Sequence, residues 1–399
     1  MGGPDKSCEE ARRVSVLGAT GSVGQSTIEL IELNSASYNV EALTANNNAK
    51  LLAEQARRLD AKFVAIANPG KYKELRSEVD GANVEIAAGP ESIIEASTRD
   101  ADWVMAAIVG AAGLKPTIQA IKHATVVALA NKECLVCAGE LMLEQIIKSE
   151  CTLLPVDSEH NAIFQVFSSD NREEIKRIIL TASGGPFRRM SYEEMEDVTP
   201  SEAVAHPNWD MGDKISVDSA TMMNKGLELI EAHFLFGLPE KKIDILVHPQ
   251  SIIHSMVEYV DGSILAQLGS PDMRTPISYS LAWPGRMEMP NANLNLADIG
   301  ALTFETPDIE KFPALALARE ALLIGKSAPA ILNAANEEAV AAFLIGKVGF
   351  LDIARIVDET LERMSFKNIR SIDELLSIDA NARRLAQDLV ADFTVKRDA

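Results

Sequence analysis

Three side chains in one short segment could do chemistry together. Asn224, Lys225 and Glu228 supply an amide, a cation and a carboxylate. The segment has helix-forming character, and residues three and four apart share one face of a helix, so these groups should point the same way. A Lys and a Glu at this spacing are often only a solvated surface pair. Met222 and Met223 come immediately before them and are unusual for a surface helix, which favours an active site.

Two further carboxylates follow a predicted strand at 152–156. Asp157 and Glu159 come next in the chain, and strand-like alternation places both on one side, at the carboxyl edge of the sheet where open α/β proteins bind ligands. Together with Glu228 they would form an all-oxygen site for Mg²⁺ or Mn²⁺, with Co²⁺ as a further candidate. Asp157 or Ser158 could also cap the helix that follows, and the two roles do not exclude each other.

Two other motifs fall where polar groups could meet a ligand. Asn131, Lys132 and Glu133 follow the preceding strand and therefore reach the same sheet edge. A Ser-Gly-Gly turn begins at Ser183, and its exposed amides and hydroxyl suit a phosphate. The net charge of −20 opposes an anionic ligand, so a phosphate site must supply its own positive groups.

The loop 205–213 has the composition of a lid. Pro207 and Gly212 bracket Trp209 in an otherwise polar stretch, and His206 adds another group that can touch a ligand. Because loops that close over active sites combine hinge residues with ligand contacts, we expect this loop to cover a substrate.

A glycine-rich turn near the N-terminus indicates a dinucleotide site. The turn 18–24, Gly-Ala-Thr-Gly-Ser-Val-Gly, follows the predicted strand 13–17 and opens the predicted helix 25–33. Glycines allow the backbone to approach a pyrophosphate, and the helix N-terminus supplies N–H groups. The turn alone would be weak evidence, but its place in an N-terminal strand-turn-helix unit favours nucleotide binding. The second strand ends at the asparagines 46–48, with no acid for the ribose of NAD, which favours NADP.

Short apolar strands alternate with helical stretches over the first part of the chain. This alternation predicts an α/β fold with a Rossmann-like, doubly wound parallel sheet. The predicted strands are 13–17, 38–44, 62–66, 103–108, 125–128 and 152–156, and the predicted helices are 25–33 and 49–59. From about Asp157 the pattern becomes α+β, with strands at 177–182 and 262–268 and a helix from about Ser219. After Pro313 it is almost wholly helical, as in a helical bundle.

These changes of pattern divide the chain into domains. A chain of 399 residues is longer than one hydrophobic core usually supports. We expect a nucleotide-binding domain at 1–156, a catalytic domain with the metal and substrate sites at 157–285, a linker at 286–312 and a helical domain at 313–399. The linker assignment depends on the Pro, Asn and Gly content between 283 and 306.

Composition excludes several classes of protein. The net charge of −20, without a basic run, argues against nucleic acid as a partner. The longest apolar stretch, 103–114, is too short to cross a bilayer, and the first residues lack an apolar signal core, so we expect a cytoplasmic protein without a membrane partner. Four cysteines fit a reducing compartment, and Cys134 and Cys137 are expected to be buried thiols because no second pair has zinc spacing.

In this order the motifs resemble those of one family, the 1-deoxy-D-xylulose 5-phosphate reductoisomerases of the non-mevalonate isoprenoid pathway. The resemblance runs from Gly18 through the helical C-terminus and includes the Asn-Lys-Glu, Asp-Ser-Glu, Ser-Gly-Gly, His-Pro-Asn-Trp and Asn-Lys-Gly-x-Glu motifs. It implies an NADPH- and metal-dependent enzyme that rearranges the substrate's carbon skeleton to an aldehyde and reduces that to 2-C-methyl-D-erythritol 4-phosphate. It also implies a homodimer and a phosphorylated sugar as substrate.

The resemblance also implies roles for particular residues. Catalytic roles fall on Lys132, Asp157, Glu159, Glu228 and His206, and the metal ligands are Asp157, Glu159 and Glu228. The substrate-binding residues are Lys132, Ser158, Glu159, Ser183, His206, Trp209, Ser219, Asn224, Lys225, Glu228 and His254. The cofactor-binding residues are Thr20, Gly21, Ser22, Val23, Asn46, Asn47, Asn48, Asn131, Glu133, Met211, Gly212 and Met273.

The sequence departs from the family pattern at one place, and it leaves two alternative functions open. Many members carry Gly-Lys-Asn after the second strand, where this chain has three asparagines at 46–48 and so lacks the cation expected at the 2′-phosphate. One rival is a dehydrogenase of the semialdehyde or homoserine type, which would need a catalytic Cys or a lysine pair in the second domain. The other is a non-catalytic NADP-binding protein, which predicts a degraded set of carboxylates.

Overall fold

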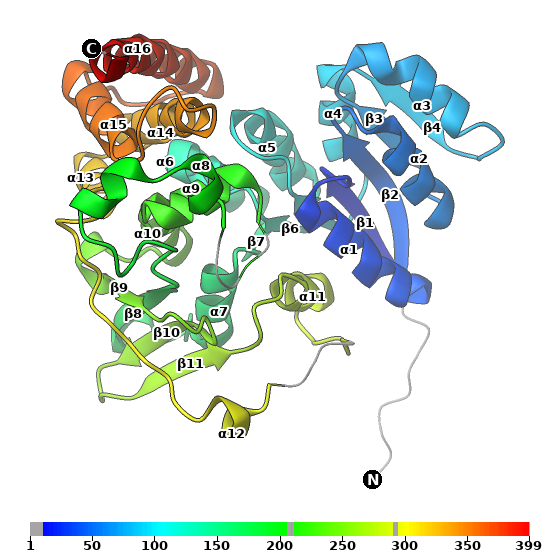
Figure 1. The fold of residues 1–399 in the computed structure, drawn as a ribbon. Coiled ribbons are helices and arrows are strands. Elements are labelled where there is room, and N and C mark those ends of the chain that lie inside the picture. Colours follow the sequence, from blue (N-terminus) through cyan, green and yellow to red (C-terminus); the bar gives the residue numbers. More distant parts are fainter. Residues whose placement is uncertain (1–10, 206–208, 210, 290–293, 399) are drawn as a thin grey trace. The chain divides into compact units, whose positions relative to one another are not determined.

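The structure is a computed structural model that describes residues 11–205, 209, 211–289 and 294–398, with the side chains only as far as 394. Two compact units are distinguished by their internal contacts (Figure 1). The first comprises Met1–Asn131, Leu143–Asp157 and Met273–Met289, and the second comprises Lys132–Met142, Ser158–Asp272 and Pro290–Ala399.

A seven-stranded sheet forms the centre of the first unit, with all of its pairs parallel. Its strand order is β4-β3-β2-β1-β5-β6-β7. The strands are β1 (Arg12–Leu17), β2 (Tyr38–Ala45), β3 (Phe63–Ile66), β4 (Glu85–Ala88), β5 (Trp103–Ala106), β6 (Val126–Leu129) and β7 (Thr152–Pro155). Because β3, β5 and β6 are buried along their whole length, they lack alternation and appear in the sequence as short apolar runs. The predicted Rossmann-like sheet is confirmed.

Helices follow most of these strands. They are α1 (Ser22–Leu33), α2 (Ala49–Arg58), α3 (Tyr72–Glu78), α4 (Pro90–Ser97), α5 (Leu114–His123) and the later part of α6 (Glu133–Ser149). A helix from much later in the chain, α11 (Arg274–Ala282), joins the same unit and packs against α1. The indole nitrogen of Trp103 donates to the carbonyl of Ser280 at 3.0 Å, and Arg12 donates to that of Leu281 at 2.9 Å.

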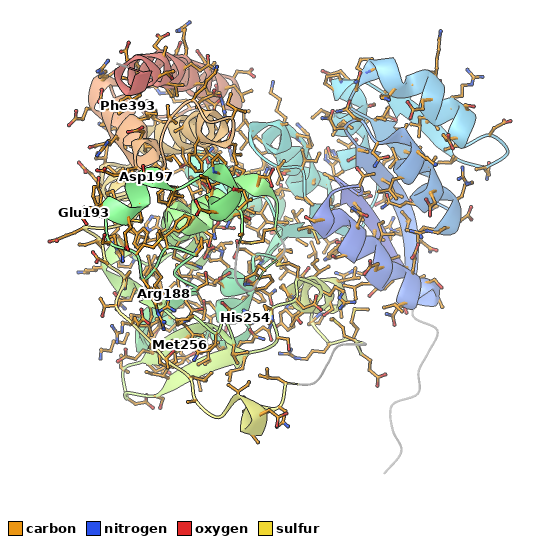
Figure 2. All side chains as sticks on the ribbon, in the orientation of Figure 1. Arg188, Glu193, Asp197, His254, Met256 and Phe393 are labelled. Atoms are coloured by element: carbon orange, nitrogen blue, oxygen red, sulfur yellow. The ribbon has the colours of Figure 1, made fainter. Side chains whose placement is uncertain are left out.

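The second unit contains a four-stranded sheet in the order β11-β10-β8-β9. Its strands are β8 (Ile175–Ala182), β9 (Ile243–Val247), β10 (Ile253–Tyr259) and β11 (Ile264–Leu268). β8 and β9 are parallel, and the other pairs are antiparallel. Ile179, Ile253 and Met256 form a buried cluster on this sheet, and Met256 lies on β10 together with His254 (Figure 2).

Helices make up the rest of the second unit. They are α7 (Ser158–Val166), α8 (Pro200–Ala203), α9 (Asp213–Ala220), α10 (Met223–Phe236), α12 (Leu296–Ile299), α13 (Ala314–Ile324), α14 (Ala328–Leu344), α15 (Asp352–Arg363) and α16 (Ile372–Asp398). α7 packs against β10, and α10 packs against α13. Gly226 makes the second contact possible, because a Cβ there would lie 2.6 Å from the Cβ of Ala318. Among the described residues, no helix is both long and apolar enough to cross a membrane.

Two expectations about local structure are wrong. The helix expected from about Ser219 is two helices, because the chain breaks between α9 and α10 at Met222, which has a left-handed φ of 64°. Glu159 lies in the first turn of α7 and not in an extension of β7, so period-two alternation is not what brings it near Asp157. In the first case no Gly or Pro marks the turn, and in the second Pro155 ends β7 two residues before Asp157.

Candidate active site

The turn between β1 and α1 has a shape that only glycine permits at two positions. Gly18 has a φ of 92°, and a Cβ there would lie 2.7 Å from the carbonyl oxygen of Ala107. A Cβ on Gly24 would collide with the carbonyl oxygen of Gly18. Within this described turn, no side chain caps α1 and its first turn contains no acid, so its N–H groups and its dipole suit a pyrophosphate.

Two glycine substitutions distinguish the contribution of this turn to folding stability from its contribution to cofactor binding. Gly24→Ala is expected to lower the free energy of unfolding by about 2 kcal/mol, because the new methyl group meets backbone that cannot move aside. Gly21→Ala should change that free energy by no more than about 0.5 kcal/mol, because its Cβ would lie 3.4 Å from the Gly18 oxygen, at ordinary contact distance.

Gly21→Ala should nevertheless weaken NADPH binding roughly tenfold, because the added methyl group hinders the close approach of the pyrophosphate and so weakens about one hydrogen bond from the backbone to a charged group. Thermal unfolding and a titration of NADPH fluorescence measure the two effects. Unchanged NADPH affinity in Gly21→Ala would mean that the pyrophosphate does not approach this turn.

The three asparagines after β2 are exposed, and the side chains of two accept hydrogen bonds within the first unit. The Oδ1 of Asn48 accepts a hydrogen bond from the Leu51 amide at 3.1 Å and so caps α2. The Oδ1 of Asn47 accepts one from the side chain of Asn68 at 2.8 Å. The sequence therefore has a structural use for Asn48, while the exposed Asn46 and Asn47 remain predicted contacts of the cofactor.

Asn131 connects two loops at the carboxyl edge of the parallel sheet. It is buried, and its Nδ2 donates to the carbonyls of Ile108 at 2.5 Å and Gly110 at 3.0 Å. This arrangement fixes the loop after β5 beside the loop after β6, where open parallel sheets bind their ligands.

Three carboxylates lie close enough together to share one cation. Asp157 directly precedes α7, Glu159 is in its first turn, and Glu228 is on α10. One oxygen of each lies within 4.8 Å of the others. Oxygen ligands of this kind are what a hard divalent ion such as Mg²⁺ or Mn²⁺ requires, so the donor set fits the predicted metal.

Two lysines neutralise these carboxylates in the structure. The Nζ of Lys225 is 3.0 Å from Glu159 Oε1 and also forms an ion pair with Glu228. The Nζ of Lys132 lies 3.5 Å from Glu228 and donates to Asn224 Oδ1 at 2.8 Å. Because Glu228 is 1% exposed, its negative charge depends on such partners. Lys225 and Glu228 are therefore not a solvated surface pair.

The predicted phosphate residues belong to three elements. Ser183 follows β8, in a turn where Gly184 and Gly185 both have left-handed φ values. A Cβ on Gly185 would lie 2.8 Å from the carbonyl oxygen of Ser219, so this turn lies against the end of α9. Asn224 and Lys225 occupy the first turn of α10, a helix end that favours anions.

His254 lies on β10 and is almost fully buried (Figure 2). Burial lowers the pKa of its imidazole, which is therefore neutral at neutral pH. Its ring centroid is 6.1 Å from that of Trp209, so two predicted substrate residues are neighbours. Of the other residues predicted in the loop, His206 lies outside the described residues, and Gly212 is the N-cap of α9.

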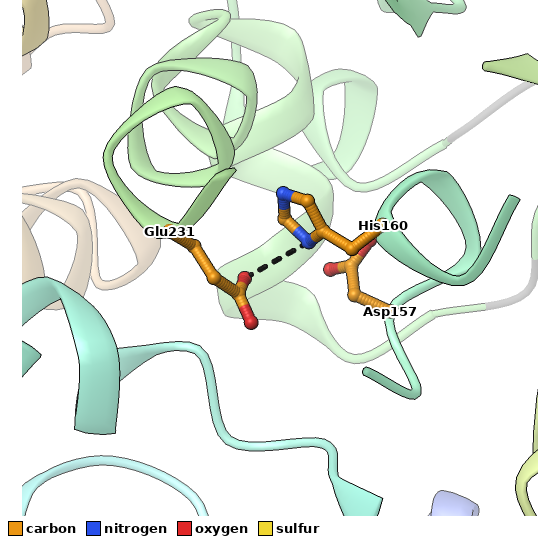
Figure 3. Close-up of side chains that lie close together, drawn as sticks. All are labelled: Asp157, His160 and Glu231. Atoms are coloured by element: carbon orange, nitrogen blue, oxygen red, sulfur yellow. Dashed lines mark ion pairs between the residues drawn. The ribbon is translucent and has the colours of Figure 1, made fainter. Parts of the chain in front are cut away.

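The sequence interpretation missed two buried titratable residues beside the carboxylates. His160 and Glu231 are 0% and 1% exposed, and the Nδ1 of His160 is 3.2 Å from Glu231 Oε2 (Figure 3). Glu231 follows Glu228 by three residues on α10, so a second acid on the same helical face was the available signal.

Sequence profiles of one enzyme family match most of the chain. Three sequence profiles match consecutive parts of the chain: 1-deoxy-D-xylulose 5-phosphate reductoisomerase at 14–139, the 1-deoxy-D-xylulose 5-phosphate reductoisomerase C-terminal domain at 153–236, and the DXP reductoisomerase C-terminal domain at 268–385. A reductoisomerase of Zymomonas mobilis is 58% identical over 96% of this chain and 98% of its own length. The chain belongs to the 1-deoxy-D-xylulose 5-phosphate reductoisomerase family.

Other members of the reductoisomerase family agree. The protein of that name from Rhodospirillum centenum is 56% identical over 95% of this chain and 94% of its own length. A solved structure of the Zymomonas mobilis reductoisomerase in complex with NADPH matches with a TM-score of 0.92 over 96% of this chain and 99% of its own. A DOX-P reductoisomerase in complex with NADPH, fosmidomycin and magnesium, 42% identical, matches with a TM-score of 0.90 over 95% of this chain and 98% of its own.

Proposed function

We propose that the chain catalyses the NADPH- and divalent-metal-dependent isomerisation and reduction of 1-deoxy-D-xylulose 5-phosphate to 2-C-methyl-D-erythritol 4-phosphate. The observation that carries this conclusion is family membership over nearly the whole chain, with relatives at 56% and 58% identity. It supports an NADPH-dependent oxidoreductase, and neither a dehydrogenase of the semialdehyde or homoserine type nor a non-catalytic protein. Solved relatives bind NADPH and magnesium, which supports the same cofactors here.

The three clustered carboxylates are the proposed metal ligands. Asp157, Glu159 and Glu228 would hold Mg²⁺ or Mn²⁺, and Co²⁺ is a further candidate. When bound, the ion supplies Lewis acidity toward the ketone and the adjacent hydroxyl of the substrate. The chain supports this chemistry by keeping Glu228 buried and oriented, since Asn224 donates to its Oε1 at 2.5 Å.

The proposed substrate phosphate lies at the N-terminus of α10. Ser183, Ser219, Asn224 and Lys225 would bind it, and the helix end adds its own partial positive charge. Lys225 would exchange partners: its ammonium neutralises Glu159 and Glu228 in the free protein, and it binds the phosphate once these carboxylates hold a divalent ion.

The other assigned residues keep their predicted roles as part of this proposal. The residues that would contact the substrate are Lys132, Ser158, Glu159, His206, Trp209, Glu228 and His254. Of these, Lys132 and His206 would act in catalysis. The residues that would contact NADPH are Thr20, Gly21, Ser22, Val23, Asn46, Asn47, Asn48, Asn131, Glu133, Met211, Gly212 and Met273.

The loop 205–213 would act as a flap over the substrate. The neighbouring rings of Trp209 and His254 support an enclosed, partly apolar substrate site.

Asn47→Lys tests how the chain reads the 2′-phosphate without a cation. The exposed side chain should gain a charge-assisted contact of about 1 kcal/mol, so the KM for NADPH should fall about fivefold while that for NADH stays the same. Steady-state kinetics with both cofactors measure this.

Asn47→Lys also removes the hydrogen bond between the side chains of Asn47 and Asn68. Asn68→Ala, which removes that hydrogen bond without adding a charge, is therefore the control. Asn47→Asp should raise the KM for NADPH. A parallel change in the constants for both cofactors would mean that the loop does not read the 2′ position.

Compartment, assembly and domain limits complete the proposal. Free thiols at Cys134, Cys137 and Cys151 support a reducing compartment such as the cytoplasm. β11 is an edge strand that exposes Ile264 and Leu265 by 51% and 49%, and an uncovered apolar edge supports a homodimer. The domain limits 1–156, 157–285 and 313–399, with a linker at 286–312, stand as predictions.

A substrate comparison tests the proposed reaction. Consumption of NADPH should be followed at saturating Mg²⁺ with 1-deoxy-D-xylulose 5-phosphate, aspartate semialdehyde or no substrate. The proposal expects turnover with the sugar phosphate alone, and 2-C-methyl-D-erythritol 4-phosphate formed in equal amount to the NADPH oxidised. Turnover with the semialdehyde and not the sugar phosphate would overturn it.

A further inference from the structure

A buried acid one helical turn beyond Glu228 has no part in the reaction described above. Glu231 is 1% exposed and lies on α10 among apolar residues such as Leu227 and Ile230. A carboxylate taken out of water costs several kcal/mol unless a partner compensates it. Its position therefore requires a partner, and the structure provides one on a different helix.

The partner is His160 on α7, which joins Glu231 to the backbone of Glu228. One ring nitrogen, Nδ1, is 3.2 Å from Glu231 Oε2, and the other, Nε2, is 2.9 Å from the carbonyl oxygen of Glu228 (Figure 3 for the first contact). A carbonyl oxygen can only accept, so Nε2 carries a hydrogen. Glu231 Oε2 lies beside the other nitrogen, Nδ1, at ion-pair distance, so its charge favours this orientation of the ring, as carboxylates do for the histidines of metal sites.

This connection joins the two helices at the residues that bear the carboxylates. His160 is the residue after Glu159, and the carbonyl that it holds belongs to Glu228. A shift of the imidazole would change the separation between α7 and α10 where the oxygens must converge. Mg²⁺ and Mn²⁺ demand close to octahedral geometry, so small errors in that separation weaken binding.

We propose that Glu231 is a positioning residue of the metal site, acting through His160 to set the separation of Glu159 and Glu228. The proposal rests on the proposed function, since it takes Asp157, Glu159 and Glu228 as the metal ligands. Glu231 itself touches neither the substrate nor the ion.

A competing arrangement uses the same side chains differently. Asp157, His160 and Glu231 also offer ligand atoms within 4.8 Å of one another, so they could themselves hold a cation (Figure 3). The contacts favour positioning, because Nε2 donates to the Glu228 carbonyl at 2.9 Å and Nδ1 faces Glu231 at 3.2 Å. In the competing arrangement, Nδ1 would be bonded to the ion.

Binding of Mn²⁺ to the full chain, followed by its EPR signal, tests the proposal. Glu231→Gln keeps the size and a polar group beside His160 but loses the charge, and Glu231→Met keeps the approximate size but loses the charge and the polar group. We expect the Kd for Mn²⁺ to rise about tenfold in the first and about a hundredfold in the second, the range found for partners of metal ligands. The Kd for NADPH should not change, and kcat should return at saturating Mn²⁺, which a merely misfolded variant would not show.

Two further variants make the test specific. In a His160→Gln background, Glu231→Gln should add no further loss of Mn²⁺ affinity, because the residue acts through the ring. Glu258→Gln is the control for losing a mostly buried acid, since Glu258 pairs with Lys176 and Arg177 on the sheet, and it should bind Mn²⁺ like the wild type.

Three results would overturn the positioning role. They are wild-type Mn²⁺ affinity in Glu231→Gln and Glu231→Met, additive losses in the double variant, or nitrogen hyperfine coupling from a histidine bonded directly to Mn²⁺ in the wild type. Failure of the proposed function has a different signature, because the wild-type protein itself would then bind no Mn²⁺ or turn over without it.

Discussion

Glu228→Gln is expected to lower kcat/KM for the sugar phosphate by at least about a hundredfold at limiting Mg²⁺, while the Kd for NADPH stays unchanged. Gln preserves the size of the side chain and the hydrogen bond from Asn224, but it removes the charge that a hard divalent ion requires. It also leaves Lys132 and Lys225 without the carboxylate that both of them face. Steady-state kinetics over a Mg²⁺ series and a fluorescence titration of NADPH measure the two constants.

Glu258→Gln serves again as the matched control, and its kinetics should equal those of the wild type. A Glu228→Gln variant with the wild-type rate at limiting Mg²⁺ would show that Glu228 is not a ligand of the catalytic ion. A loss of NADPH affinity in the same variant would show that the substitution disturbs more than the metal site.

Lys225→Met should have the second large effect, on stability as well as on turnover. In metal-free buffer the loss of the ammonium removes the cation that compensates the negative charges of Glu159 and Glu228. We therefore expect the free energy of unfolding to fall by about 3 kcal/mol. Mg²⁺ should restore most of this loss, because it neutralises the same carboxylates. Turnover should still be at least about a hundredfold lower, since the proposed phosphate site has lost its cation. Denaturant unfolding with and without Mg²⁺ measures the first effect.

Lys148→Met is the control for this variant. Lys148 and Glu144 are an exposed Lys–Glu pair at helical spacing, so their loss should change the free energy of unfolding by no more than about 0.5 kcal/mol, with or without Mg²⁺. Equal stability of Lys225→Met and the wild type in metal-free buffer would mean that Lys225 does not neutralise the carboxylates.

The parallel sheet could be predicted because its signals are local. Strands such as β5 and β6 are buried on both faces, and each is a short apolar run that stands out between polar turns. The glycines at 18 and 24 are required by contacts within their own turn, so their spacing identifies it.

Other elements could not be predicted because tertiary contacts decide them. β9 and β10 include polar residues such as Asp244 and His254, which meet Arg177 and Trp209 only in the folded unit and interrupt any simple pattern. The left-handed turn at Met222 carries no Gly or Asn, so nothing in the sequence separates α9 from α10. α11 joins the first unit through hydrogen bonds from Arg12 and Trp103, each more than 170 positions away in the chain.

The candidate site divides in the same way. Spacing on one helix identified Asn224, Lys225 and Glu228 as neighbours, and all three lie in α10. Spacing could not indicate that Lys225 lies against Glu159 of another helix, nor that His160 meets Glu231, because these are contacts between α7 and α10. The sequence therefore supplied the chemical groups, and the packing of the two helices decides which of them interact.

Occupancy of the carboxylate site by Mn²⁺, measured by EPR on the same samples whose NADPH oxidation with 1-deoxy-D-xylulose 5-phosphate is followed, tests the central claim most directly. The claim predicts one tightly bound ion per chain, a rate that rises in proportion to its occupancy, and loss of both in Asp157→Asn, Glu159→Gln and Glu228→Gln. Full turnover in metal-stripped protein, or wild-type occupancy in all three variants, would contradict it.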